Sequence, residues 1–156
     1  MPVIAAGQPV PDFSLATPNG RFTRDALAGR TSVLVFYPFA FSPVCTDQLA
    51  LYDELREDFA ERQVTVYGVS CDAVWSQQAF KAQLGVAIEQ LSDFEPKGET
   101  CRAFGVYHPG GFPQRALVVI DPDGVVAWSY QADNPGELPG ANLIFDGLAA
   151  GERTPG

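Results

Sequence analysis

Two hydrophobic periodicities alternate along the chain. Residues 31–37, TSVLVFY, and 64–70, VTVYGVS, are nearly continuous runs of β-branched and aromatic side chains. Such runs are typical of strands that are buried on both faces. Between them, apolar positions recur every three or four residues from 49 to 59. This spacing predicts a helix over residues 45–61, with one face against the two strands.

The same two periodicities predict the other elements. Residues 12–22 alternate apolar and polar positions around Asn19-Gly20, a pair that tolerates the positive φ of a tight turn, so we expect a β-hairpin there. A short helix is expected from Thr23 to Ala28, ending at Gly29. It is followed by a helix over 73–84, a strand over 88–91 and a helical segment over 96–104. The last expected elements are a strand over 115–120, its hairpin partner over 125–130 across the turn 121–124, and a helix over 141–150.

The order of these elements indicates the fold class. Strands interleaved with helices and followed by a hairpin predict an α/β protein whose sheet is partly parallel. The order resembles that of a thioredoxin-like fold, here with an N-terminal β-hairpin extension. No internal repeat or long linker divides the chain, so we expect a single domain over residues 1–156. A fold of this kind hosts many activities and does not by itself assign one.

Composition and charge narrow the classes of partner. The chain is 46% apolar and 19% charged, which is ordinary for a globular protein with one core. Ten Lys and Arg face nineteen Asp and Glu, and the net charge is -9. Nucleic-acid backbones and anionic membranes are bound by clusters of Lys and Arg, and this sequence has no such cluster. We therefore expect neither nucleic acid nor a membrane as partner. The first residues lack the basic and apolar regions of a signal peptide, which predicts a cytoplasmic location.

Candidate chemistry centres on a cysteine. The three cysteines, Cys45, Cys71 and Cys101, are too widely spaced for the disulfide framework of a small secreted domain. Cys45 stands where the strand over 31–37 has ended and a helix is expected to begin. The free N–H groups and the helix dipole at such a position favour an anion. They therefore favour the thiolate, which is the nucleophilic form of cysteine.

The residues before Cys45 complete a candidate site. Ser42 lies three residues earlier, and its hydroxyl can accept a hydrogen bond from a substrate and donate one to sulfur. Pro38 ends the strand and is expected to shield the site from water. Phe39 and Phe41 supply apolar walls, so we expect Cys45 at the bottom of a pocket.

These residues carry a resemblance to a known family. Pro38-x-x-x-Ser42-x-x-Cys45 resembles the peroxiredoxin motif Pro-x-x-x-Thr/Ser-x-x-Cys and follows the expected apolar strand. PDFSL near the N-terminus, the stretch 91–106 and the C-terminal helix also fit, so the resemblance covers essentially the whole chain. The context FYPFAFSPVCT and the short C-terminus are most similar to the one-cysteine, alkyl hydroperoxide reductase E type.

The resemblance implies a thiol-dependent peroxidase that reduces hydrogen peroxide and organic hydroperoxides. Cys45 would become a sulfenic acid, which an external thiol would resolve, with no metal, flavin or haem. The family's site arginine corresponds to Arg115, which opens the strand over 115–120. Many members carry a glutamate three residues after the cysteine, where this chain has Gln48, a neutral acceptor for Arg115. The resemblance also implies a homodimer formed around the active-site loop, with Phe41 or Phe80 at the contact.

Several alternatives use the same residues. Cys45 could serve a peroxide-responsive redox sensor, or Cys101 could resolve it in a two-cysteine peroxidase. Cys71 follows a strand and is expected to be a buried small apolar side chain. A dithiol oxidoreductase would use Cys-x-x-Cys, which is absent. A hydrolase or a zinc site would need His108, which lies in a Pro/Gly-rich turn, and the three cysteines lack the short paired spacing of zinc motifs.

Overall fold

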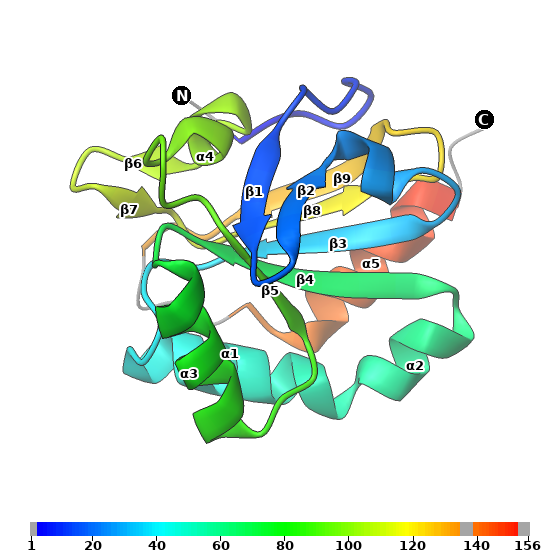
Figure 1. Ribbon diagram of the computed structural model, residues 1–156. Helices are drawn as coiled ribbons and strands as arrows, with labels where there is room; N and C mark the ends of the chain where they lie inside the picture. The colour runs from blue at the N-terminus through cyan, green and yellow to red at the C-terminus, as the bar shows by residue number, and fades with distance from the viewer. Residues whose placement is uncertain (1–2, 135–138, 153–156) are drawn as a thin grey trace.

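The computed structural model describes residues 3–134 and 139–152. Within these residues, nine strands form two sheets. The strands are β1 (Ser14–Thr17), β2 (Gly20–Thr23), β3 (Thr31–Phe36), β4 (Val64–Ser70), β5 (Glu89–Ser92), β6 (Tyr107–His108), β7 (Phe112–Pro113), β8 (Ala116–Ile120) and β9 (Val126–Gln131). Seven of them form the central sheet in the order β2-β1-β5-β4-β3-β8-β9, and β6 pairs with β7 beside it (Figure 1).

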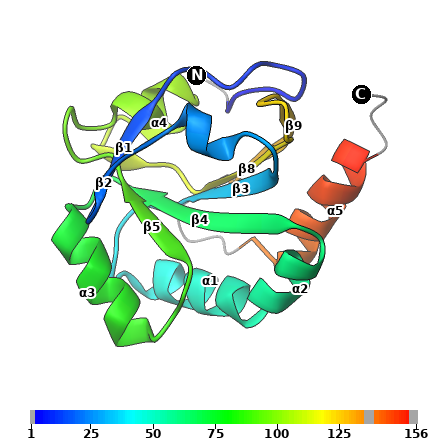
Figure 2. The same ribbon diagram turned by 45° about the vertical axis from the view of Figure 1, so that its right-hand side comes forward.

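Helices cover both faces of the central sheet unequally. They are a 3-10 helix η1 (Arg24–Leu27) and the α-helices α1 (Pro43–Glu54), α2 (Arg56–Glu61), α3 (Val74–Leu84), α4 (Glu99–Ala103) and α5 (Ala141–Glu152). Figures 1 and 2 show α1, α2, α3 and α5 on one face, and the β1–β2 hairpin with η1 and α4 on the other. In the described ranges, none of these helices has the length and apolar character needed to cross a bilayer.

The strand directions follow from the connections. β3 runs parallel to β4, and β4 runs parallel to β5, because a helical crossover joins each pair. β8 is antiparallel to both β3 and β9. The N-terminal hairpin joins the edge of the sheet where Ala16 pairs with Ser92. This architecture is a thioredoxin-like fold with an N-terminal hairpin extension, as the sequence predicts.

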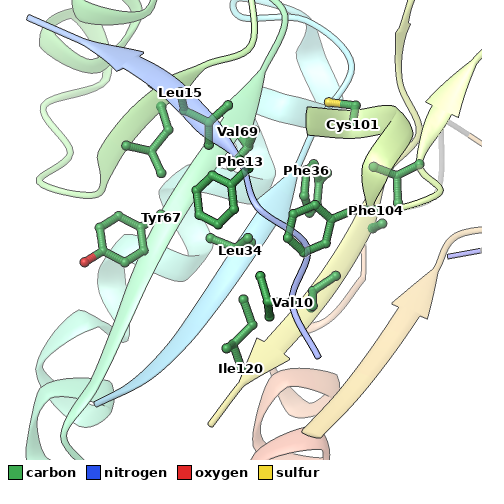
Figure 3. Close-up of a cluster of buried hydrophobic side chains, with 14 of the residues drawn as sticks. Val10, Phe13, Leu15, Leu34, Phe36, Tyr67, Val69, Cys101, Phe104 and Ile120 are labelled. Atoms are coloured by element: carbon green, nitrogen blue, oxygen red, sulfur yellow. The ribbon is translucent and has the colours of Figure 1, made fainter. Parts of the chain in front are cut away.

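The pleat of β3 divides the interior into two cores. Leu34 and Phe36 face the hairpin side, in a cluster with Phe104 and Cys101 that Figure 3 shows in close-up. Val33, Val35 and Tyr37 face the helix side, with Cys45 among their neighbours in the second cluster. Successive side chains of a strand point to opposite faces, so the backbone of the sheet separates the two clusters. We call them the hairpin-side core and the helix-side core.

Most expected elements are confirmed, with shifts at their ends. The hairpin forms, but Thr17 pairs with Gly20, so the two turn residues are Pro18 and Asn19, one position earlier than expected. Thr23 precedes η1 in an extended conformation, and its side chain makes no capping hydrogen bond. The helical segment expected over 96–104 is confined to α4.

Two expectations about helices and strands are wrong. The single helix expected over 45–61 is two helices, because the backbone of Leu55 (φ -100°, ψ 7°) leaves helical geometry between α1 and α2. The hairpin of β6 and β7 is missing from the sequence-based expectation. Each of its strands has two residues, which is too short to show an alternating pattern.

Candidate active site

The first turn of α1 presents Cys45. The helix begins at Pro43, two residues before the expected start, and proline is favoured there because its missing N–H would have no helical partner. Ser42 occupies the N-cap position, and its carbonyl accepts the first helical hydrogen bond, from the N–H of Thr46 at 2.9 Å. The N–H groups of Val44 and Cys45 precede that bond and point out of the helix end. An anion at Cys45 is therefore stabilised by these dipoles.

A strained loop brings the chain from β3 to this helix. β3 ends at Phe36, one residue earlier than expected, and the buried Pro38 follows in the loop. Phe41 has a φ of 70°, in the left-handed region that non-glycine residues rarely occupy. A conformation of this kind costs about 1–3 kcal/mol and is concentrated at functional sites. It turns the chain sharply just before Ser42 and the helix start.

Arg115 contacts the cysteine directly. Its Nη2 donates to Sγ of Cys45 at 3.1 Å, and both side chains are buried. The register of the sheet explains this contact. Phe36, the last residue of β3, pairs with Ala116, the first residue of β8. Arg115 therefore lies beside the end of β3, from which the loop leads to Cys45.

A chain of hydrogen bonds holds Arg115 in place. Nη1 of Arg115 donates to Oε1 of Gln48, so the acceptor role expected for Gln48 is present. Nε2 of Gln48 donates to the hydroxyl of Tyr52 at 3.3 Å, and this hydroxyl donates to the carbonyl of Pro139 at 2.6 Å. Burial raises the pKa of Tyr52 to about 12, so the phenol keeps the proton that it donates. Sequence reasoning treated Tyr52 only as an apolar helix position and missed this role.

Ser42 and the two loop phenylalanines lie around the helix start. The Ser42 hydroxyl donates to the carbonyl of Phe39 at 2.9 Å, within the loop. Phe39 and Phe41 are each 47% exposed. The ring of Phe39 packs against Phe112, and that of Phe41 packs against Phe80. Phe80 is only 1% exposed, so it belongs to the helix-side core and is not accessible at the surface as expected for a partner contact.

A small cavity borders the other side of Arg115. Its volume is about 240 Å³, and its lining residues are His108, Gln114, Arg115, Ala132, Asp133 and Asn134. His108 lies in β6 and not in a turn; its ring stacks on Phe112, and its Nδ1 accepts from the N–H of Gly110 at 2.8 Å. These contacts hold His108 against β7. A hollow of comparable size between Arg62, Asp121 and Leu148 lies toward the far end of β3 and contains none of the predicted site residues.

The other two cysteines lie across the sheet from Cys45. Cys71 and Cys101 belong to the hairpin-side core, whereas Cys45 belongs to the helix-side core. A hydrogen bond with Cys71 and burial both raise the pKa of Cys101 well above its usual range. The structure thus brings Cys45, Gln48 and Arg115 together and keeps Cys101 apart from them.

Comparisons with known proteins assign the chain to a family. Residues 6–129 match the AhpC/TSA family. Alkyl hydroperoxide reductase E of Mycobacterium tuberculosis is 29% identical over 154 residues, covering 95% of this chain and 98% of that protein. A peroxiredoxin of Thermoplasma volcanium is 32% identical over 133 residues, covering 82% of this chain and 65% of that protein. The crystal structure of Enterococcus faecalis AhpC has a TM-score of 0.85 at 25% identity, covering 95% of this chain and 92% of that one.

The matched region runs from before the N-terminal hairpin to the middle of β9, so it includes the other six strands of the central sheet together with Cys45 and Arg115. The relatives that match along it are named peroxiredoxins and alkyl hydroperoxide reductases. The chain therefore belongs to the AhpC/TSA family of peroxiredoxins, thiol peroxidases that act on hydroperoxides.

Proposed function

We propose that Cys45 reduces hydrogen peroxide and organic hydroperoxides and that an external thiol then restores it. The contact of 3.1 Å between Nη2 of Arg115 and Sγ of Cys45 is the observation that carries this proposal. A buried guanidinium is stabilised by an anion beside it, and the thiolate of Cys45 supplies one. The dipoles at the start of α1 act in the same direction.

The first chemical step is nucleophilic attack on the peroxide. The thiolate of Cys45 forms a bond to one peroxide oxygen while the O–O bond breaks, and the other oxygen leaves with a negative charge. Arg115 and the N–H of Cys45 stabilise that charge, and the hydroxyl of Ser42 does so once it turns away from the carbonyl of Phe39, to which it donates at 2.9 Å. The leaving oxygen takes up a proton and departs as water or an alcohol. Cys45 remains as a sulfenic acid.

The second step returns Cys45 to the thiol. An external thiol attacks the sulfenic sulfur, water leaves, and a mixed disulfide forms. A second thiol attacks this disulfide and releases Cys45, so each peroxide consumes two thiols. Cys45 and Cys101 pack in different cores, which supports an external thiol as the partner of Cys45. All three cysteines are free in the structure, which fits a reducing compartment such as the cytoplasm.

The hydrogen-bond partner of Arg115 is the neutral side chain of Gln48. Gln48 orients the guanidinium without neutralising it, so the positive charge acts on the thiolate and the departing oxygen. Pro38, Phe39 and Phe41 surround the helix start with apolar surface that limits water and suits an organic hydroperoxide. Gln48 and Tyr52 act through Arg115 and are therefore positioning residues.

Substitution of Arg115 tests the proposed chemistry. We expect Arg115→Ala to lower the second-order rate constant for peroxide reduction by about 10²-fold or more, as for the loss of an oxyanion donor. Stopped-flow kinetics with reduced protein would measure this rate. Arg30→Ala, which removes an exposed arginine bonded to Thr65, is the matched control and should react like the wild type. Cys45→Ser defines the rate without the nucleophile, and activity retained in Cys45→Ser would contradict the proposal.

The one-cysteine mechanism predicts that the other thiols are dispensable for turnover. We expect Cys71→Ser/Cys101→Ser to sustain continuous peroxide consumption with a small-molecule thiol at the wild-type rate. A sensor would instead consume one equivalent and stop. In the wild type, non-reducing peptide mapping during turnover should find Cys45 as a sulfenic acid or a mixed disulfide. A Cys45–Cys101 disulfide formed as fast as peroxide disappears would refute this mechanism.

We also propose that the chain forms a homodimer through the apolar surface near the active-site loop. Phe39 and Phe41 of this loop are each 47% exposed, Phe94 is 52% exposed and Trp75 at the start of α3 is 72% exposed. Exposed aromatic side chains are enriched in protein interfaces. Light scattering of the wild type should give the mass of two chains, and Phe41→Ser should shift the population toward one chain. A wild type that is monomeric at tens of micromolar would contradict the dimer.

A further inference from the structure

The hairpin-side core contains a cluster of metal-binding side chains that the peroxide chemistry does not use. Sγ of Cys71, Sγ of Cys101 and a carboxylate oxygen of Asp93 all lie within 4.8 Å of one another. All three side chains are buried, and Cys71 is the most accessible at 8% exposed. Cys71 directly follows β4, Asp93 directly follows β5, and Cys101 lies in α4. Figure 3 shows Cys101 at one end of this core, near Phe36 and Phe104.

Hydrogen bonds fix the carboxylate of Asp93 in this cluster. Its Oδ1 accepts from the N–H of Thr100 at 3.1 Å, and its Oδ2 accepts from the N–H of Cys101 at 2.8 Å. The N–H of Asp93 donates to the carbonyl of Ser70 at 2.8 Å, which ties the residue to the end of β4. The side chain of Cys101 also hydrogen-bonds to this carboxylate. A carboxylate has about four acceptor sites, so these three bonds still leave a lone pair, and the thiol bond is given up when Cys101 binds the ion. Such outer hydrogen bonds orient the ligands of protein metal sites.

The donor set selects the class of metal. Two thiolates and one carboxylate suit Zn²⁺, which binds sulfur at about 2.3 Å and carboxylate oxygen at about 2.0–2.2 Å in tetrahedral sites. Two sulfurs on a tetrahedral zinc ion lie about 3.8 Å apart. A sulfur and a carboxylate oxygen on the same ion lie about 3.6 Å apart, so the separations within the cluster, at most 4.8 Å, need to close by up to about 1.2 Å on binding.

We propose that Cys71, Asp93 and Cys101 bind one Zn²⁺ per chain, with a water molecule as the fourth ligand. Both thiols lose their protons when the ion binds, so affinity rises with pH. The ion links the ends of β4 and β5 to α4, and it stabilises the fold because the unfolded chain lacks the assembled site. This site is separate from Cys45, so it does not depend on the proposed peroxidase mechanism.

Cobalt spectroscopy tests the site without any measurement of activity. The protein would be Cys45→Ser, reduced and metal-free, which removes the active-site thiol and leaves Cys71 and Cys101. Titration with Co²⁺ should give a sulfur-to-cobalt charge-transfer band that saturates at one ion per chain and disappears when Zn²⁺ is added. Adding Cys71→Ser or Cys101→Ser should weaken Zn²⁺ binding by at least about 100-fold, the upper end of the effect of outer-shell changes. Asp133→Asn, at an exposed acid, is the matched control and should leave binding unchanged.

Other results would contradict the zinc site. A folded, reduced Cys45→Ser protein without a sulfur-to-cobalt band would overturn the proposal, as would a band that persists after Cys101→Ser. A thiol-alkylation assay on Cys45→Ser covers the case in which the double variants do not fold: Zn²⁺ should protect both remaining thiols. If both react equally fast with and without Zn²⁺, or if air forms a Cys71–Cys101 disulfide at the same rate with Zn²⁺ present, the cluster is not a zinc site.

Discussion

The contact between the guanidinium of Arg115 and the sulfur of Cys45 is the interaction on which the rest of the site depends. It joins two residues that are 70 positions apart and both buried. A buried charge is costly unless it is paired or hydrogen-bonded, so the surrounding structure has to hold both groups closely. The pairing of β3 with β8 supplies one side of this contact, and the strained turn at Phe41 supplies the other. Gln48 and Tyr52 then fix the direction of the guanidinium from within α1.

The pleat of the sheet has a second consequence, which is the separation of the thiols. Cys45 packs in the same core as Val33 and Val35 of β3. Cys71 and Cys101 pack in the other core, with Leu34 and Phe36 of the same strand. A sulfur on one face cannot reach the other without opening the structure around it. The same alternation that builds two cores therefore assigns the cysteines to two chemical environments. The proposed zinc site on the hairpin side and the proposed peroxide site on the helix side are therefore separated by the sheet.

The sequence predicts the strands well and points to one candidate nucleophile, because both have local signals. β3 and β4 are continuous apolar runs, and Cys45 follows the first of them at a fixed spacing from Pro38 and Ser42. The helix expected from residue 45 begins two residues earlier, at Pro43, because the apolar spacing on which that expectation depends does not include the proline that opens the first turn. The break at Leu55 leaves the helical periodicity of the apolar residues intact, so that pattern does not show it.

Local sequence patterns do not predict contacts between distant segments, and only the family resemblance predicts one of them. Arg115 was assigned by resemblance, and its position beside Cys45 depends on a strand register that no local pattern encodes. The hydrogen bond from Tyr52 to Pro139 spans 87 residues. The cluster of Cys71, Asp93 and Cys101 has no short spacing, because its members come from three segments that only the folded sheet brings together. His108, the residue that a sequence-based zinc site would need, does not belong to this cluster.

Mass spectrometry after exposure to one equivalent of hydroperoxide tests the central claim most directly. Reduced wild-type protein would be quenched with a sulfenic-acid trap, digested and mapped at all three cysteines. We predict that Cys45, the residue beside Arg115, reacts first, so the trap should be bound to the sulfur of Cys45 while Cys71 and Cys101 remain unmodified. Oxidation of Cys71 or Cys101 while Cys45 remains a thiol would contradict the account.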